Sequence, residues 1–418
     1  MTRRPAVQPP PSQPDGRAYH VVVTSGRTTT AHDENKRRLR QYLTQHPDTQ
    51  IADLAYTTTA RRMHHVHRDA YVVKSTAELL RQLEQPTPPP AEKASSVVFA
   101  FTGQGAQHVG MGGTLYRTSP TFRRLLDSYQ HLCNAQGLDC QFLDTIRGSG
   151  DATSTGATTT ERDIQVATVA LEIALARFWQ SLGLRPTLLI GHSLGEYAAL
   201  CIAGVLSVGN ALALAHECAT LIFSECPPSE AGMLAVALPA STVKYRLRDS
   251  AATVGCEVCC LNGPSSTVVG GPLPAIEAFK DYLKSDGNVS VARLRVQHAF
   301  HTRQMDPVLD PLKSSASRVN FHAPTIPVAS TLLGRIVQPG EDGVFNANYL
   351  RRHTREAVAF IDAVRACETE GLIQDQSLVV EVGPHPVCIG LMASSLQGVS
   401  PSAYPSLRRG RDDWESIS

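Results

Sequence analysis

The sequence of 418 residues contains no long apolar run and almost no excess of either charge. No apolar stretch approaches the roughly 18 residues that a transmembrane helix needs, so the sequence predicts no membrane-spanning segment. Lysine and arginine number 39 and aspartate and glutamate 38, which gives a formal net charge of +1. Because nucleic-acid and membrane-surface binding usually need a basic excess, we expect neither partner.

The start of the chain, MTRRPAVQPPP, also lacks the apolar core of a signal peptide. We therefore expect a cytoplasmic protein whose ten cysteines are reduced thiols. Cys256, Cys259 and Cys260 have C-x-x-C spacing, but Val254 and Val258 beside them are typical of a buried strand. For this reason we predict no metal site at these cysteines. We also expect no bound cofactor.

Composition is ordinary for an α/β protein, with 42% hydrophobic and 18% charged residues, and the length predicts about two or three domains. Residues 1–16 are polar and rich in proline, which predicts disorder. Periodic patterns then predict a small α/β unit that a proline run at 86–90 closes. Its expected elements are strands at 19–25 and 70–74, helices at 33–45 and 76–85, and either type at 51–59.

Residues 61–68 of this unit read RRMHHVHR. Such a run could bind phosphate or metal, but a strand with inward and outward residues in alternation is the interpretation that we favour. Farther along the chain, residues 148–160 are rich in glycine, serine and threonine, which predicts a flexible surface loop.

The second half of the chain contains a β-α-β-β-α-β order between residues 232 and 295. This order is typical of a ferredoxin-like insert. The strands are expected at 232–238, 254–261 and 267–270, and the helices at 241–249 and 273–285.

The strongest local signal is LLIGHSLGEYAALCIAGV at residues 188–205, where Ser193 lies between Gly191 and Gly195. A short apolar run precedes the serine and an apolar pattern of helical period follows it. Strand, sharp turn and helix together are the context in which G-x-S-x-G forms a nucleophile elbow. The turn would place the hydroxyl at a helix N-terminus, which favours a developing negative charge. The alternative is that Ser193 caps a core helix.

A second glycine-rich loop follows the continuous apolar run at 97–101, which we expect to be a buried strand. The loop reads TGQGAQ, and its glycines let main-chain N–H groups face a site. A helix at 164–182 leads to the elbow, and a last apolar strand at 377–382 ends in GPHP.

Four motifs together resemble the malonyl-CoA:acyl-carrier-protein transacylases and the acyltransferase domains of polyketide synthases. They are FTGQGAQ at 101–107, GHSLGE at 191–196, HAFH at 298–301 and EVGPHP at 381–386. AYTTTARR at 55–62 is similar to the linker between ketosynthase and acyltransferase in fungal iterative synthases, and SLRRG at 406–410 resembles the strap that folds back along that linker.

The resemblance implies an α/β-hydrolase-like acyltransferase core with an inserted ferredoxin-like subdomain and an N-terminal α/β linker domain. A linker and a strap further imply a domain excised from a synthase, most similar to the non-reducing type. The boundaries expected are a disordered start at 1–16, the linker domain at 17–92, the core at 93–231 and 296–395, the subdomain at 232–295 and the strap at 396–418.

The resemblance also assigns roles to residues. Ser193 would attack the acyl-CoA thioester and His301 would act as general base, through a serine-linked acyl-enzyme. The bulky Phe300 would leave no room for a 2-methyl branch, which favours malonyl over branched extenders. The other roles implied are backbone oxyanion donors at Gln104 and Leu194, a carbonyl at His353 that orients His301, and substrate contacts at Gln165, Cys218, His298 and Phe300.

One position departs from the family pattern. The family holds the substrate carboxylate with an arginine where this chain has Cys218, and no arginine occurs between Arg185 and Arg246. An arginine–carboxylate pair is a strong anchor, so a starter-type transacylase for an uncarboxylated acyl-CoA stays a second hypothesis. His216 is a candidate replacement for the missing charge.

Two other classes of protein are alternatives to an acyltransferase. A serine hydrolase would need an acid between serine and histidine, for which Asp249, Asp281 and Asp286 are available by type only. A catalytically idle docking domain would not need both Ser193 and His301.

The partners implied are acyl-CoA, an acyl carrier protein with its phosphopantetheine thiol and an adjacent ketosynthase domain. Carrier proteins of this kind are generally acidic. For the carrier we therefore expect docking at Arg351 and Arg352, with a solvated helix end as the alternative.

Overall fold

The computed structural model describes residues 16–85, 94–148, 160–228, 230–249, 253–285, 287 and 289–418. The predicted disordered start, the proline run at 86–90 and the predicted loop at 148–160 lie outside these ranges, apart from end residues. In the described part, no helix is both long and apolar enough to cross a membrane. The chain forms two compact units, one of residues 1–92, 117–120 and 410–418 and the other of residues 93–116 and 121–409.

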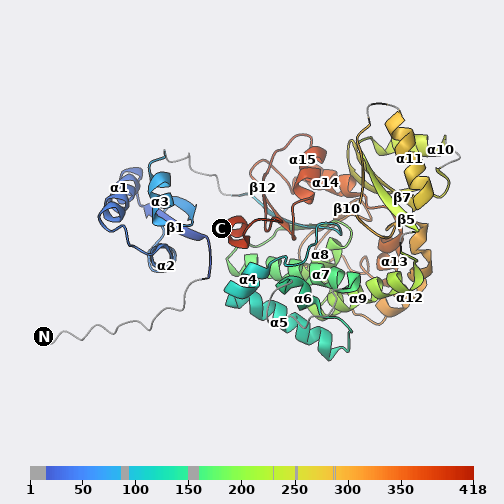
Figure 1. Ribbon diagram of the computed structural model, residues 1–418, viewed down its shortest axis with the longest axis horizontal. Helices are drawn as coiled ribbons and strands as arrows, with labels where there is room; N and C mark the ends of the chain where they lie inside the picture. Colours follow the sequence, from blue (N-terminus) through green and yellow to red (C-terminus); the bar gives the residue numbers. More distant parts are fainter. Residues whose placement is uncertain are drawn as a thin grey trace. The chain divides into compact units, whose positions relative to one another are not determined.

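The smaller unit is built on a two-stranded antiparallel sheet, drawn in blue in Figure 1. Strand β1 (His20–Gly26) pairs with β2 (His67–Val73) from His20↔Val73 to Gly26↔His67. Alternate residues of β1 are buried, as the period-two pattern predicts. Leucines from the helices pack on Val22 and Val73 in one small core. The helices are α1 (Thr29–Gln45), α2 (Ile51–Ala60), α3 (Thr76–Leu83) and the late α16 (Asp413–Ile417).

The prediction of a strand at residues 61–68 is wrong for most of this segment. Only His67 and Arg68 belong to β2, and residues 61–66 form a loop. The pairing partner β1 ends at Gly26 opposite His67, so the preceding residues have no strand to pair with. Met63 and Val66 are accordingly 74% and 85% exposed.

The larger unit contains a six-stranded sheet in the order β10-β9-β4-β3-β11-β12. All neighbours are parallel except β10, which runs antiparallel to β9. The central strands are buried on both faces, which explains why they read as continuous apolar runs. The strands are β3 (Val97–Phe101), β4 (Leu188–Gly191), β9 (Val328–Ser330), β10 (Arg335–Val337), β11 (Leu378–Val382) and β12 (Ser402–Pro405).

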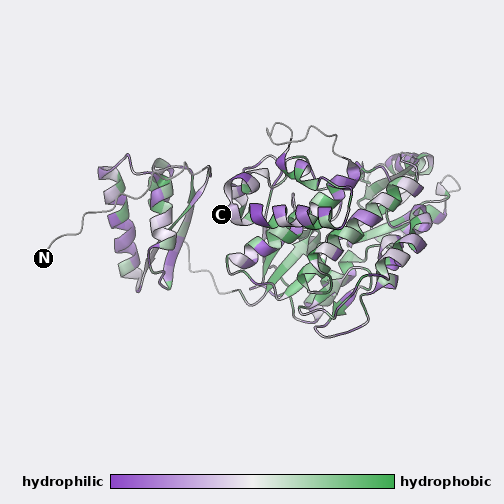
Figure 2. Ribbon diagram, turned by 90° about the horizontal axis from the view of Figure 1, so that it is seen from below, coloured by the Kyte–Doolittle hydropathy of each residue, from purple (hydrophilic) through white to green (hydrophobic). Residues whose placement is uncertain are grey.

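Helices cover this sheet, and in Figure 2 the strands are largely green while the outer helices carry purple residues. The longest, α7 (Glu161–Ser181), is buried along most of its length and begins at a capping box of Thr160 and Asp163. The others are α4 (Gly113–Thr118), α5 (Pro120–Ala135), α6 (Phe142–Arg147), α8 (Gly195–Ile202), α9 (Val208–Glu225), α12 (Asp306–Ala316), α13 (Ala347–Arg355), α14 (Phe360–Thr369) and α15 (Cys388–Ser395).

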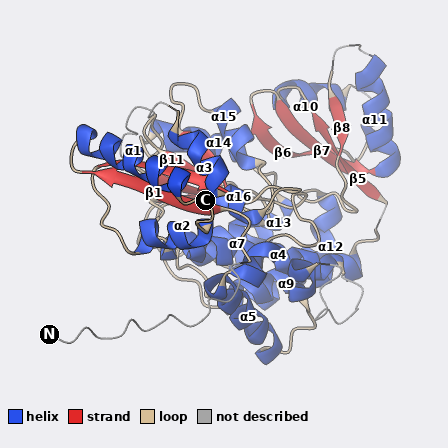
Figure 3. Cartoon of the chain, turned by 60° about the vertical axis from the view of Figure 1, so that its left-hand side comes forward, coloured by secondary structure: helices blue, strands red, loops and turns tan. Residues whose placement is uncertain are grey.

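The expected β-α-β-β-α-β subdomain is present as a second, four-stranded sheet in the order β6-β7-β5-β8, antiparallel throughout. Its two helices share one apolar cluster with the strands and pack on one face (Figure 3). The elements are β5 (Ala231–Val236), α10 (Ala240–Arg248), β6 (Glu257–Gly263), β7 (Ser266–Pro272), α11 (Leu273–Ser285) and β8 (Val291–Arg293). The expected inclusion of Val254 in a buried strand is wrong: Val254 is 75% exposed, and Gly255 turns the chain with a φ of 90°.

The sheet order brings two loops together. Strands β3 and β4 are parallel neighbours, and Phe101 is paired with Gly191 at their carboxyl ends. The TGQGAQ loop and the G-x-S-x-G turn therefore leave the sheet side by side. In open α/β sheets the carboxyl ends of the strands are the usual position of a ligand site.

Candidate active site

Ser193 lies at the tip of the turn between β4 and α8 with a φ of 50°, which non-glycine residues seldom adopt. Both flanking glycines are sterically required. A Cβ on Gly191 would lie 2.5 Å from the Glu196 Cα atom, and one on Gly195 would lie 2.5 Å from the Phe101 carbonyl oxygen. The N-cap of α8 is Leu194, so Ser193 does not cap the helix and its hydroxyl is available.

The Ser193 hydroxyl lies against a histidine 108 positions later in the chain. Its Oγ is 2.6 Å from Nε2 of His301, which itself has a φ of 60°. The other ring nitrogen, Nδ1, lies 3.0 Å from the His353 carbonyl and 3.1 Å from the Glu356 carbonyl. Because both of these partners are acceptors, Nδ1 carries the proton and Nε2 accepts from the serine.

The two carbonyls that orient His301 lie at the C-terminal end of α13. This end of a helix carries partial negative charge and would stabilise an imidazolium, a role that an aspartate has in a triad. Burial, and then the neighbouring His353 and His192 side chains, lower the pKa of His301 to about 3. The resting imidazole is therefore neutral and able to accept a proton.

The acid that a serine hydrolase would need is not found beside His301. Among the described residues no carboxylate hydrogen bonds to His301. Asp249 ends α10 and Asp281 lies in α11, both in the subdomain, and Asp286 lies outside the described residues. The hydrolase hypothesis thus has no support from the geometry.

A buried carboxylate connects the helix of the nucleophile to the helix that orients the base. Glu196, on α8, is 1% exposed and accepts hydrogen bonds from the Thr331 hydroxyl at 2.8 Å and from the Tyr349 hydroxyl. Its Oε2 also lies 3.5 Å from Nε2 of His353 on α13. We conclude that Glu196 fixes α8 and α13 relative to each other.

The TGQGAQ loop is held from both of its ends. The Thr102 hydroxyl donates to the Glu381 carboxylate at 3.2 Å. At the other end, the guanidinium of Arg409 donates to the carbonyls of Ala106 at 3.1 Å and Gln107 at 2.8 Å. Gln104, whose N–H is an expected oxyanion donor, lies between these two attachments.

A cavity of about 40 Å³ opens beside the Ser193–His301 pair. The structure brings the predicted residues Gln104, Gln165, Leu194, Cys218, Phe300 and His353 together around it. Sequence reasoning missed three further lining residues: Tyr197, Ile222 and Thr354. Tyr197 and Ile222 fit the apolar pattern of a helix core, so no signal in the sequence distinguished them.

Neither His298 nor His216 lines the cavity. Nε2 of His298 is 3.1 Å from the Cys226 carbonyl. The His298 ring packs against the rings of Phe223 and Phe300 and so restricts the position of Phe300. The candidate role of His216 finds no support, because its side chain is buried with Nε2 3.3 Å from the Asp139 carbonyl and does not line the cavity. It therefore does not replace an arginine at Cys218.

The arginines expected at a docking surface are both paired. Arg351 lies 3.1 Å from Asp310, and Arg352 lies 2.6 Å from Glu356. Their part in docking stays a prediction. In the described residues no group of three or more histidine, cysteine, aspartate and glutamate side chains is arranged to hold a metal ion.

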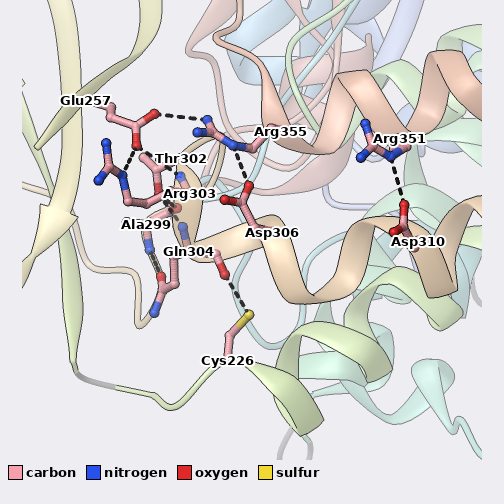
Figure 4. Close-up of polar contacts among 10 residues, drawn as sticks. All are labelled: Cys226, Glu257, Ala299, Thr302, Arg303, Gln304, Asp306, Asp310, Arg351 and Arg355. Carbon is pink, nitrogen blue, oxygen red and sulfur yellow. Dashed lines mark hydrogen bonds and ion pairs between the residues drawn. The ribbon is translucent and has the colours of Figure 1, made fainter. Parts of the chain in front are cut away.

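Charged side chains anchor the loop of His301 to its surroundings (Figure 4). Glu257, on β6 of the subdomain, accepts from the Arg303 side chain at 2.6 Å and from Arg355 at 3.0 Å. Arg355 also pairs with Asp306 at 2.6 Å. Since Arg303 follows His301 closely and Arg355 adjoins the carbonyls that orient it, Glu257 connects both elements that position the base.

Comparison with known proteins finds one family over most of the chain. Residues 98–416 match the acyl transferase domain, and residues 20–83 match a family described as CurL-like, PKS C-terminal. Orsellinic acid synthase of Emericella nidulans is 70% identical over 415 residues, which cover 99% of this chain and 20% of that protein. Non-reducing polyketide synthase crz7 of Cladonia metacorallifera is 41% identical over 411 residues, covering 97% and 19%. The chain thus spans about a fifth of the length of these curated relatives.

Solved structures share the fold. The acyl transferase domain of SpnD, in complex with 2-(pent-4-yn-1-yl)malonyl, has a TM-score of 0.78 at 28% identity over 96% of this chain and 93% of that one. The acyl transferase domain of ZmaA has a TM-score of 0.80 at 25% identity, covering 96% and 92%. These likenesses confirm the predicted α/β acyltransferase fold.

Proposed function

Because the chain belongs to the acyl transferase domain family of polyketide synthases, we propose that this acyltransferase moves a malonyl group from CoA to the phosphopantetheine thiol of an acyl carrier protein. The group would be carried as an ester on Ser193. The observation that carries the proposal is the 2.6 Å contact between the Ser193 hydroxyl, held in a strained turn, and a neutral His301.

In the first half-reaction the Ser193 oxygen attacks the thioester carbonyl while Nε2 of His301 takes its proton. Backbone N–H groups of Gln104 and Leu194 would hold the oxyanion, and such donors are worth about 2.7–4 kcal/mol each in comparable sites. The C–S bond then breaks, and the imidazolium gives its proton to the departing CoA thiolate.

In the second half-reaction the carrier thiol gives its proton to His301 and its sulfur attacks the ester. The C–O bond to Ser193 breaks, and the serine oxygen recovers the proton. In both halves the carbonyls of His353 and Glu356 would stabilise the imidazolium. No cofactor bound by the chain itself enters this scheme.

Two features support malonyl as the group transferred. Phe300 lines the cavity and is braced by the ring of His298, which limits the space for a branched acyl group. A related acyl transferase domain is described as a complex with a substituted malonyl group. Curated relatives are much longer synthases, so we propose that the carrier protein and a ketosynthase domain are its partners.

A starter-type reaction with an uncarboxylated acyl-CoA is the second candidate. It is favoured by Cys218, which lines the cavity and carries no cationic group. Intact-mass spectrometry after brief exposure to malonyl-, acetyl- and hexanoyl-CoA separates the two, because the mass added to the chain identifies the acyl group. Addition of malonyl alone is the expected result, and addition of acetyl or hexanoyl alone would favour the starter reaction.

For the carrier we propose docking beside Arg351 and Arg352. Both are partly exposed and close in sequence to His353, although each pairs with a carboxylate. Charge reversal of both should raise the KM for the carrier and leave the KM for malonyl-CoA unchanged. An unchanged carrier KM would remove these arginines from the interface.

A further inference from the structure

Two buried hydrogen-bond donors that line the cavity have no partner. Gln165 on α7 and Tyr197 on α8 are each 3% exposed, and neither the Gln165 side-chain nitrogen nor the Tyr197 hydroxyl has a hydrogen-bond acceptor. A buried donor without an acceptor destabilises a fold. Such groups gathered at one cavity indicate that a ligand supplies the acceptors.

The neighbours of Tyr197 do not satisfy it. Its hydroxyl lies beside the Cys218 thiol and the Thr354 hydroxyl but meets hydrogen-bond geometry with neither. The Thr354 hydroxyl donates to the Leu350 carbonyl at 2.9 Å and could only accept from Tyr197, but the two hydroxyls do not meet hydrogen-bond geometry. The Tyr197 hydroxyl is therefore free to donate into the cavity.

Among the described residues that line the cavity there is no arginine or lysine. The catalytic base His301 is neutral at rest. Burial raises the pKa of the Cys218 thiol to about 11, so this side chain is uncharged as well. The polar end of an acyl group would here meet the uncharged donors Gln165 and Tyr197.

We propose that Tyr197, together with Gln165, holds the free carboxylate of the malonyl group by hydrogen bonds from uncharged donors. This inference rests on the proposed acyl transfer through Ser193. An acetyl group would leave both donors unsatisfied, whereas the carboxylate offers two acceptor oxygens. Selection would then depend on accepting a hydrogen bond and not on net charge.

A loading assay with four thioesters tests the proposal. The whole chain is mixed in turn with malonyl-, acetyl-, acetoacetyl- and butyryl-CoA, quenched at short times and analysed by intact mass. Acetoacetyl and butyryl differ by one carbonyl oxygen near the position of the malonyl carboxylate. We expect wild type to load acetoacetyl faster than butyryl, and equal rates would overturn the proposal.

The variants are Tyr197→Phe and Gln165→Leu, with Tyr129→Phe as the matched control. Tyr129 is another buried tyrosine, on α5, and does not line the cavity. We expect the ratio of malonyl to acetyl loading to fall at least about tenfold in the first two, since a donor to a charged acceptor is lost. The control should keep the wild-type ratio.

The outcomes separate this proposal from the one on which it rests. If wild type loads no acyl group at all, the proposed function fails. If wild type loads malonyl and Tyr197→Phe keeps the ratio, or slows both thioesters equally, only the inference about Tyr197 is overturned. Should Tyr197→Phe fail to fold in a thermal melt, the ratio in Gln165→Leu decides.

Discussion

The region that carries Ser193 and the region that carries His301 hold their side chains in different ways. Ser193 is fixed by buried backbone: a central strand, two glycines against neighbouring main chain, and the first turn of α8. His301 lies in a loop after the subdomain strand β8, and charged side chains of Glu257, Arg303 and Arg355 anchor its surroundings. These side chains are between 22% and 65% exposed.

This difference predicts different sensitivities. Packed backbone is insensitive to salt, whereas partly exposed ion pairs are weak and are screened by salt. We therefore expect the position of the nucleophile to survive changes of solvent that loosen the position of the base.

The largest effect is expected from removal of the nucleophile. Ser193→Ala should abolish acyl loading from every CoA thioester, because no other serine of the described residues lies in a strained turn against the catalytic base. The fold should persist, since the substitution removes one partly buried oxygen that faces the cavity, from a turn fixed by its glycines. Intact mass measures acyl loading, and a thermal melt measures the stability of the fold. An acyl label at another residue would contradict the assignment of Ser193 as nucleophile.

Removal of the base should have a smaller effect. His301→Ala should slow loading by about 10²–10⁴-fold, which is the usual contribution of general-base catalysis. Rapid-quench loading with malonyl-CoA measures the rate. Loading at the wild-type rate would show that the proton goes elsewhere.

The pH dependence should report the buried state of His301. Since burial lowers the pKa of this base to about 3, the imidazole stays in its reactive neutral form as the pH falls through 6.5, the ordinary histidine value. The loading rate should therefore be nearly constant between about pH 5 and pH 8. A rate that halves near pH 6.5 would mean that His301 is solvated in solution.

The smallest effect is expected at the ion-pair anchor. Glu257→Gln should lower the loading rate by about threefold to tenfold, because two ion pairs of at most about 1 kcal/mol each are lost. Added salt should reduce the difference from wild type.

Glu277→Gln is the matched control for this variant. Glu277 also accepts from two cations of the subdomain, Lys280 and Arg293, but it does not contact the loop of His301. It should load at the wild-type rate at every salt concentration. Equal effects of the two variants would show that Glu257 acts only on the stability of the subdomain.

The difference between the Ser193 region and the His301 region also explains which features could be predicted from the sequence. The apolar run 97–101 and the elbow at Ser193 are local patterns, and both elements lie where they were expected. The contact of His301 with Ser193 spans 108 positions and that with the His353 carbonyl spans 52, so only family resemblance suggested them. Tyr197 was missed because a tyrosine within a buried helical pattern looks like core, and its unsatisfied hydroxyl is a property of the folded cavity alone.

The strand wrongly expected at 61–66 has a related cause. Alternation of side chains indicates that a segment could be a strand, but pairing requires a neighbour with free backbone groups. β1 offers none beyond Gly26. A single segment contains no information about where its partner ends.

The attachment of Arg409 to the carbonyls of Ala106 and Gln107 has a consequence for the order of events during synthesis. During translation Ser193 and His301 leave the ribosome well before β12 and Arg409. Strand β12 completes the edge of the sheet beside β11. Until those late residues emerge, the loop that contains Gln104 lacks one of its two attachments. We expect the nascent chain to be inert toward acyl-CoA until translation has passed Arg409.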